Sequence, residues 1–243
     1  MKIIRVNDYT EMSIKAAEFM IEKIRRSPNI NLGLATGGTP VGLYEHLVKD
    51  HKKNNTSYRN VTTFNLDEYI GLSGEDPNSY RYFMDQHLFN HIDIQKSNTC
   101  VPLGNAKNPQ QYCVDYEKLL TVHGGIDIQI LGIGSNGHIG FNEPGTSFLS
   151  ETHIVELAAS TREANARFFN SLNEVPTHAI TMGIASIMRS KEILLLISGE
   201  SKRDALAQLL QGEVNENFPA SILRTHPCVT IIADMAAIGK IAV

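Results

Sequence analysis

Cysteine is scarce in this sequence, which argues against a fold held together by disulfides. The 243-residue chain has three cysteines, Cys100, Cys113 and Cys228. Their number is odd, they lie far apart, and no two have the C-x-x-C spacing of metal or redox motifs. We therefore expect a reducing compartment, in which the three side chains serve as small, partly buried hydrophobic groups.

The chain also lacks a basic excess and any long apolar run. Its formal net charge is −4 and its Lys and Arg residues are scattered, so neither nucleic acid nor an anionic membrane surface is an expected partner. The start of the chain, MKIIRVNDYTEM, has no apolar core of the kind found in signal peptides. The apolar run at residues 193–197 is far too short to span a bilayer. These absences predict a soluble, cytoplasmic protein.

No linker, repeat or low-complexity tract divides the sequence, which predicts one domain over residues 1–243. Helical and strand-like patterns alternate with short connections, which favours a single-domain α/β fold: a mostly parallel, doubly wound (Rossmann-like) sheet with helices on both faces. The expected helices cover residues 11–26, 79–91, 109–122, 179–188 and 236–241, and further helices begin at Pro40 and Lys202. The expected strands cover residues 30–35, 61–66, 126–133, 154–157, 192–197 and 229–233.

The stretch of residues 126–147, IDIQILGIGSNGHIGFNEPGTS, joins a short apolar run to a glycine-rich loop. The run is too short for a core helix, so we predict a buried parallel strand. Its loop would lie at the carboxyl end, where open α/β sheets bind ligands. The loop contains His138 and Glu143, two side chains able to move protons, separated by the small or apolar residues 139–141. We predict that this loop belongs to the functional site.

Three glycines of the same loop, Gly132, Gly134 and Gly137, have the G-x-G-x-x-G spacing of dinucleotide-binding proteins. That motif requires a helix to open at its third glycine, so that the pyrophosphate meets the helix N-terminus. Here the sequence continues HIGFNEPG, and Pro144 prevents a helix from starting smoothly. We therefore assign no dinucleotide site.

A second turn, TGGTP at residues 36–40, has the order strand, glycine turn and helix start of an anion site. Unpaired backbone N–H groups and the helix dipole would point at an anion held by Thr36, Gly37, Gly38 and Thr39. The alternative is a tight turn in which Thr39 only caps the helix. Lys202 also begins a helix, where a cation opposes the helix dipole unless an anion is present, so it is a candidate phosphate ligand.

For several charged residues elsewhere in the chain, the sequence is compatible with more than one role. Asp67 and Glu68 follow the strand at residues 61–66. Neighbouring residues at a strand end point to opposite sides, so at most one of them faces the ligand cleft, and a solvated charged turn is equally compatible. Arg162 and Arg167 fit either a solvated face or, if one points inward, a phosphate clamp.

Five segments, GLATGGTP, FNLDEYIGL, LGIGSNGHIGFNEPGTS, ANARFF and SGESK, resemble those of the glucosamine-6-phosphate deaminase family in sequence and order. The resemblance runs over nearly the whole chain, and GHIxFNEPG together with LDEY separates this family from the 6-phosphogluconolactonases. It implies an enzyme of amino sugar catabolism that converts D-glucosamine 6-phosphate and water to D-fructose 6-phosphate and ammonia, with no metal or organic cofactor. The alternatives are a 6-phosphogluconolactonase-like hydrolase or isomerase on the same scaffold and a non-catalytic sugar-phosphate sensor.

The resemblance also implies a role for each site residue. Asp67 is implied as the base for proton transfer from C2 to C1, and His138 as the base that assists ring opening. Glu143 and the residue at position 136, Asn136, are implied to support His138. The implied phosphate ligands are Thr36, Gly37, Gly38, Thr39, Arg167 and Lys202.

Two departures from the family's pattern change what we expect. Several members have Asp where this chain has Asn136, and an amide can orient an imidazole but cannot stabilise its cation as a carboxylate does, so His138 is expected to be a weaker base. Allosteric members have basic side chains where this chain has His153 and Val155, so we expect no strong activation by N-acetylglucosamine 6-phosphate. The resemblance further implies a mobile lid over about residues 152–178. The sequence leaves open whether the protein is a monomer or a homo-oligomer.

Overall fold

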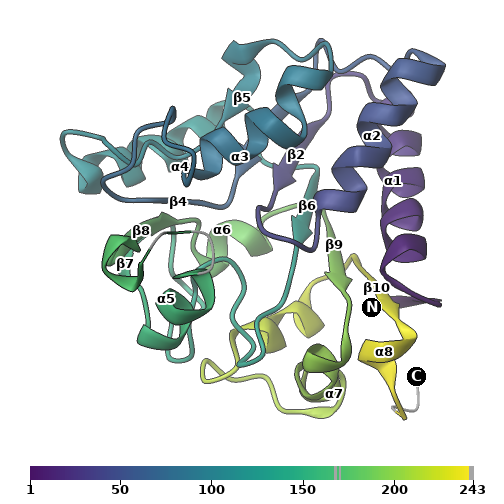
Figure 1. Ribbon diagram of the computed structural model, residues 1–243. Coiled ribbons are helices and arrows are strands. Elements are labelled where there is room, and N and C mark those ends of the chain that lie inside the picture. Colours follow the sequence, from purple (N-terminus) through teal and green to yellow (C-terminus); the bar gives the residue numbers. More distant parts are fainter. Residues whose placement is uncertain (167–168, 170, 241–243) are drawn as a thin grey trace.

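The computed structural model describes residues 1–166, 169 and 171–240. Within these residues the main sheet has seven strands, all paired in parallel (Figure 1). The predicted parallel α/β sheet is confirmed, and it contains every predicted strand except the one at residues 154–157. In spatial order the strands are β1 (Lys2–Val6), β10 (Val229–Asp234), β9 (Glu192–Ile197), β6 (Ile128–Leu131), β2 (Asn31–Leu34), β3 (Thr62–Asn65) and β5 (Thr99–Cys100).

Helices flank the main sheet on both sides. In Figure 1, α1 and α2 stand to the right of the strands, and α3 and α4 lie to the left. Strands covered on both faces are nearly all apolar, as in β9 (EILLLI) and β10 (VTIIAD). Side chains cap several helices, among them Asp8 before α1, Ser79 before α3 and Asn108 before α4. The helices are α1 (Tyr9–Arg26), α2 (Val41–Asn54), α3 (Tyr80–His87), α4 (Pro109–Val122), α5 (Ala159–Asn165), α6 (Ile184–Met188), α7 (Arg203–Gln211) and α8 (Met235–Ile238).

The chain changes its direction of travel across the sheet between β2 and β6. After β2 it adds β3 and β5 on one side, and it then returns to add β6, β9 and β10 on the other. In open α/β sheets such a switch point leaves a crevice beyond the carboxyl ends of the two central strands. The turn of residues 36–40 and the loop after β6 both begin there, so the fold brings the two predicted ligand loops together.

A second, antiparallel sheet of three strands was not predicted from the sequence. Its order is β4 (Asp67–Tyr69), β8 (His178–Thr181) and β7 (His153–Glu156). Leu66 joins the two sheets, because its N–H donates to the carbonyl of Leu34 in the main sheet and its own carbonyl accepts from Met182 N. Asp67 therefore begins a new sheet directly at the junction.

Several sequence predictions were wrong. The helix expected over residues 179–188 is the strand β8 followed by α6. Residues 179–181 pair with strands on both sides, and Gly183 is the residue before the helix. The helix expected over residues 79–91 ends at His87, where a separate 3-10 turn (Phe89–His91) follows. Thr39 does not cap α2, since Pro40 is the capping residue and no side chain bonds to the helix end. The predicted final turn is α8, and position 241 lies outside the described residues.

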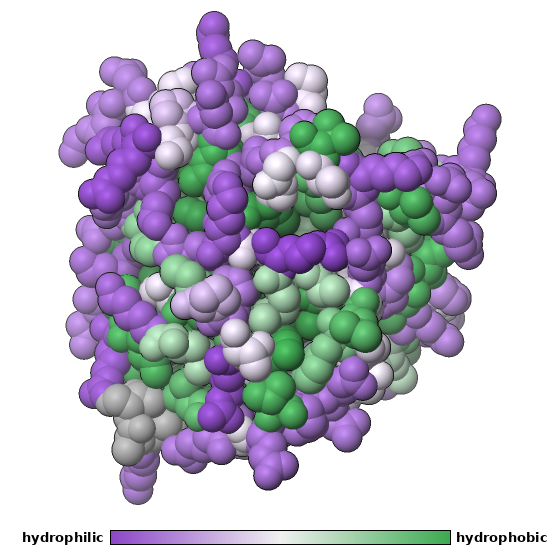
Figure 2. All heavy atoms as spheres, turned by 180° about the vertical axis from the view of Figure 1, so that it is seen from behind, coloured by the Kyte–Doolittle hydropathy of each residue, from purple (hydrophilic) through white to green (hydrophobic). Residues whose placement is uncertain are grey.

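The surface of the molecule and its cysteines agree only in part with what the composition predicts. Seen from behind, the molecule has hydrophilic side chains around its rim and hydrophobic ones scattered between them (Figure 2). No helix in the described ranges is long and apolar enough to cross a membrane.

The three cysteines are unpaired, and Cys113 is buried and Cys100 half-buried as expected, whereas Cys228 is exposed. Cys228 lies on the turn that enters β10, outside the covered part of the sheet.

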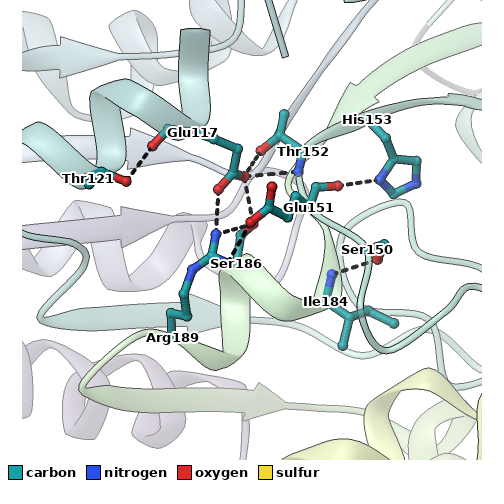
Figure 3. Close-up of polar contacts among 9 residues, drawn as sticks. All are labelled: Glu117, Thr121, Ser150, Glu151, Thr152, His153, Ile184, Ser186 and Arg189. Carbon is teal, nitrogen blue, oxygen red and sulfur yellow. Dashed lines mark hydrogen bonds and ion pairs between the residues drawn. The ribbon is translucent and has the colours of Figure 1, made fainter. Parts of the chain in front are cut away.

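A polar cluster around Glu117 of α4 holds the start of β7 in place (Figure 3). Its carboxylate accepts hydrogen bonds from the N–H of Thr152 at 2.9 Å, from the Thr152 hydroxyl at 2.5 Å and from the Ser186 hydroxyl at 2.6 Å. Arg189, at the end of α6, pairs with the second oxygen of Glu117 at 2.5 Å and with Glu151 at 2.9 Å. One carboxylate thus ties α4, α6 and the entry to the second sheet together.

Candidate active site

A cavity of about 360 Å³ lies at the switch point of the main sheet. Its walls come from the turn after β2, the loop after β6, the start of β4 and the starts of α3 and α7. Of the predicted site residues, the cavity is lined by Thr36, Gly37, Thr39, Asp67, Asn136, His138 and Lys202. The structure therefore brings most of the predicted site together around one space.

Three residues of the turn at 36–39, Thr36, Gly37 and Thr39, line the cavity. Gly37 has φ +91°, a left-handed conformation that favours glycine. Gly38 is exposed and does not line the cavity, but its carbonyl accepts a hydrogen bond from the Tyr9 hydroxyl at 3.0 Å. The same hydroxyl accepts from Gly42 N at 2.9 Å, so Tyr9 joins the turn and the start of α2 to α1.

Three basic residues, Lys202, Arg167 and Arg162, are candidates for binding the phosphate. Lys202 is the residue before α7 and lines the cavity, as predicted. Arg167 lies outside the described residues. Arg162 is turned to the protein backbone, because its guanidinium donates to the carbonyls of Leu172 and Val175 at 3.1 Å each. Among the alternatives left open for Arg162, the structure therefore favours a role in packing over one as a phosphate clamp.

Asp67 and Glu68 lie on opposite sides of β4, as the strand geometry predicts. Asp67 lines the cavity and is 7% exposed. Burial raises the pKa of Asp67 from 3.8 to about 8, and the charge of Glu68 adds to the rise. Within the described ranges no group donates a hydrogen bond to the Asp67 carboxylate, which leaves it available to a ligand. Gly140 keeps the space beside it open, since a Cβ there would lie 3.6 Å from Asp67 Oδ2.

Glu68 has a structural role on the other side of the strand. Its carboxylate accepts 2.9 Å hydrogen bonds from the backbone N–H groups of Tyr69, Tyr80 and Arg81, the last two being the first residues of α3. Burial raises the pKa of Glu68 to about 7, while these three donors oppose the rise. The structure thus excludes a solvated turn for either acid.

The loop after β6 holds His138, Asn136 and Glu143 in one hydrogen-bonded chain. His138 Nδ1 lies 2.8 Å from Asn136 Oδ1 and 3.6 Å from Glu143 Oε2. Asn136 Nδ2 donates to Glu143 Oε2 at 2.7 Å, and the Thr161 hydroxyl donates to Glu143 Oε1 at 2.6 Å. Burial alone would raise the pKa of Glu143, but its partners His138, Thr161 and Asn136 outweigh burial and lower it to about 2. Glu143 does not line the cavity and acts on it through Asn136 and His138.

The glycines of this loop leave room for neighbouring side chains. No helix follows Gly137, and the described chain runs without one from β6 to α5. A Cβ at Gly134 would lie 2.3 Å from the His138 ring, and a Cβ at Gly137 would lie 2.2 Å from the Phe218 ring. The glycine spacing therefore makes room for side chains of the protein itself, which explains why it imitates a dinucleotide motif.

The cavity residues that were not predicted as site residues include Tyr80, Phe141 and Thr161. The rings of Tyr80 and Phe141 are stacked, with centroids 6.1 Å apart and an interplanar angle of 16°. The Ser79 cap marked the start of α3, but nothing in the sequence shows that the next side chain turns into the site. Thr161 comes from α5, whose place depends on the second sheet.

The sequence matches the family model described as glucosamine-6-phosphate isomerases/6-phosphogluconolactonase over residues 7–231. The chain belongs to this family. Within it, the resemblance to glucosamine-6-phosphate deaminases is confirmed by relatives of high identity. The glucosamine-6-phosphate deaminase of Halalkalibacterium halodurans is 63% identical over 243 residues, which span all of this chain and 99% of the relative. Glucosamine-6-phosphate deaminase 1 of Bacillus subtilis is 52% identical and spans 98% of each chain.

Solved structures agree with this placement in the family. A monomeric glucosamine-6-phosphate deaminase superposes with a TM-score of 0.96, at 51% identity and with 98% of each chain covered. The 6-phosphogluconolactonase of Trypanosoma cruzi superposes with a TM-score of 0.82 at 21% identity, covering 100% of this chain and 97% of that one. The second likeness shows a shared fold alone.

Proposed function

We propose that this family member converts D-glucosamine 6-phosphate and water to D-fructose 6-phosphate and ammonia. The observation that carries the proposal is the cavity itself, in which a buried carboxyl, an imidazole backed by a carboxylate, and a glycine turn with a lysine share one space. These groups match the needs of an amino sugar phosphate: an anion site for the phosphate, a base for the ring hydroxyl and a base near C2.

The phosphate would lie on the turn of residues 36–39 with Lys202, and with Arg167 as a further proposed ligand. Backbone N–H groups at a helix start and a lysine are suited to a dianion. Anchoring the phosphate fixes which carbons of the sugar reach Asp67 and His138, which line the same cavity.

Ring opening would come first, because the C2 proton becomes acidic only next to a free aldehyde. His138 takes the proton of the C1 hydroxyl and gives it to the ring oxygen as the C1–O5 bond breaks. Asn136 and Glu143 orient the imidazole and stabilise its charged form. Asn136 interacts with both partners, so it acts here as the link between His138 and Glu143.

Isomerisation and deamination would follow at Asp67. The carboxylate takes the C2 proton while the substrate ammonium gives a proton to the aldehyde oxygen, which leaves a neutral enolamine. Asp67 then returns a proton to C1, and water attacks the resulting iminium at C2 to release ammonia and leave the ketone. A base whose pKa burial has raised to about 8 suits a carbon acid far better than an ordinary carboxylate. The segment of about residues 152–178 is proposed as the lid that shields the enolamine from water.

The test is ammonia release and ketose phosphate formation from glucosamine 6-phosphate, measured in the presence of a chelator for the wild type and for His138→Gln. We expect equal amounts of the two products from the wild type, and loss of at least about 10²-fold in rate for the variant. Binding of the sugar phosphate without ammonia release by the wild type would favour the sensor instead. Hydrolysis of 6-phosphogluconolactone would favour the lactonase, a candidate because the solved lactonase shares the fold.

A further inference from the structure

Thr161 connects the second sheet to the proton-transfer machinery of the main sheet. Its hydroxyl lies in the cavity wall and donates to Glu143 Oε1 at 2.6 Å, the short distance typical of a hydroxyl bonded to an ionised carboxylate. The other oxygen, Oε2, accepts from Asn136 at 2.7 Å. Each oxygen of Glu143 therefore has one donor, and the two donors come from different parts of the fold.

The second sheet supports both Thr161 and Asp67. α5, which carries Thr161, lies in the connection from β7 to β8, and β8 is also the partner of β4, the strand that begins with Asp67. The connection leaves β7 at Glu156 and enters β8 at His178, and these two residues are paired. Asp67 is paired with Thr181, at the other end of β8. The same sheet therefore holds Asp67 and the connection that brings Thr161 to Glu143.

We propose that Thr161 is a positioning residue for ring opening, whose hydroxyl holds the Glu143 carboxylate in the orientation that faces the His138 imidazole. The carboxylate is bound to its chain by rotatable bonds, and the Thr161 contact at Oε1 leaves Oε2 directed at Asn136 and 3.6 Å from His138 Nδ1. Without that contact, Glu143 is free to turn towards water, and His138 loses the anion that stabilises its protonated form. This inference rests on the proposed function.

A change at Thr161 alters no charge near Glu143. The one close titratable neighbour of Glu143 in the described chain is His138, and Asp67, Tyr80 and Lys202 also line the cavity. Arg162, one residue after Thr161, is engaged with backbone carbonyls. Thr161 has no charge, so its removal changes the hydrogen bonding of Glu143 and leaves the number of charges around it unchanged.

The experiment compares three variants in the full-length protein. Thr161→Val keeps the shape and removes the donor, Thr161→Ser keeps the donor, and Thr225→Val makes the same change at an exposed threonine outside the cavity and the proposed lid. We expect kcat for glucosamine 6-phosphate to fall about 10- to 100-fold in Thr161→Val, as for the loss of a hydrogen bond to a charged group, with KM within about threefold of the wild type. Thr161→Ser is expected to recover most of kcat, and Thr225→Val to match the wild type.

A double-mutant cycle and a binding measurement separate positioning from folding. In a Glu143→Gln background, Thr161→Val is expected to change kcat less than about threefold, because the group it orients is already gone. The variant is also expected to bind the reduced open-chain analogue 2-amino-2-deoxyglucitol 6-phosphate as tightly as the wild type does, which shows that its site is intact. If Thr161→Val does not fold, Thr161→Ala takes its place.

The outcomes distinguish the two proposals. A wild type that releases no ammonia overturns the proposed function, whatever Thr161 does. A wild type that is active, together with a folded Thr161→Val of unchanged kcat, overturns the role of Thr161 alone. An equal loss of kcat from Thr161→Val in the wild type and in the Glu143→Gln background also contradicts it, because the effect would then not pass through Glu143.

Discussion

Asp67 and Glu68 are adjacent in the chain, yet their carboxylates lie in different environments on the two sides of β4. Asp67 lines the cavity, whereas Glu68 accepts three backbone hydrogen bonds, two of them from the start of α3. Both are buried, at 7% and 1% exposed. A buried carboxylate with three N–H partners stabilises structure, and one that faces an open cavity without such partners is suited to chemistry.

Asp67→Asn is expected to bind substrate within about threefold of the wild type and to lose about 10²- to 10⁴-fold in turnover, as for a removed general base. Stability should not fall, because the amide has no charge to desolvate. Exchange of the C2 hydrogen with solvent deuterium, followed by NMR, measures the step directly. Near-normal turnover or exchange by this variant would refute the assignment of the base.

Glu68→Gln is expected to lose stability, in contrast to Asp67→Asn, which is expected to lose turnover. The amide NH₂ would face backbone donors, so the variant should lose about 1–3 kcal/mol of folding free energy. For a chain of this size each kcal/mol lowers Tm by roughly 2–4 °C. Thermal unfolding measures the loss, and the Asp67→Asn protein serves as the matched control, since it alters the neighbouring acid by the same chemistry.

The stability of the protein should depend on pH with opposite signs at Asp67 and Glu143. The pKa of Asp67 is raised from 3.8 to about 8 by burial and by Glu68, so the folded state holds a proton that the unfolded chain has released. The stability linked to it is fully present below pH about 4 and is lost as pH rises towards about 8. The pKa of Glu143 falls from 4.5 to about 2, because its partners outweigh burial, so its contribution is present above pH about 4.5 and is lost towards about 2.

Urea unfolding at pH 5, 6.5 and 8 tests the first of these signs. The free energy of unfolding of the wild type should decline over this range relative to that of Asp67→Asn, whose curve lacks the contribution. Parallel curves for the two proteins would show that Asp67 is already ionised at pH 5 in the folded state.

Local signals in the sequence were sufficient for much of the fold and for part of the site. The helix at residues 109–122 and the strand at residues 192–197 have the predicted bounds. Asn108 caps the helix with Pro109 at its start, and the strand is an apolar run of five residues after Glu192, too short for a core helix. Strand geometry predicted that Asp67 and Glu68 point apart, but only packing decides which one faces the cavity. Thr36, Gly37, His138 and Lys202 were found because they belong to loops after strands of the main sheet.

The second sheet explains what the sequence analysis missed. β4 has three residues and β8 has four, so neither is long enough to show a period, and the apolar residues of β8 fit a helix equally well. Thr161 and Tyr80 reach the cavity only because this sheet and Glu68 hold α5 and α3 beside it. Pairing between short segments that lie far apart in the sequence produces no local pattern from which it could be predicted.

Tyr9→Phe is expected to weaken binding of the phosphate while leaving the chemistry intact. The Tyr9 hydroxyl bonds to Gly38 O and Gly42 N, so its loss removes two hydrogen bonds of about 1 kcal/mol each from the turn. KM for glucosamine 6-phosphate should rise about 3- to 10-fold, and kcat should stay within about twofold. Tyr112→Phe, which removes a hydroxyl from α4 away from the turn, is the control, and an equal change in KM in both variants would contradict the role of Tyr9.

Glu117 and Arg189 form an ion pair whose two members should differ widely in their effect on stability. The Glu117 side chain is 13% exposed and accepts from Thr152 and Ser186 as well as from Arg189, whereas the Arg189 side chain is 54% exposed (Figure 3). Glu117→Leu leaves several donors unpaired in a buried place and should lower the free energy of unfolding by about 2–4 kcal/mol. Arg189→Met removes only an exposed charge and should lower it by about 0–1 kcal/mol. Urea unfolding of both variants measures the difference, and equal losses would mean that the ion pair itself, rather than the hydrogen bonds to Thr152 and Ser186, anchors the start of β7.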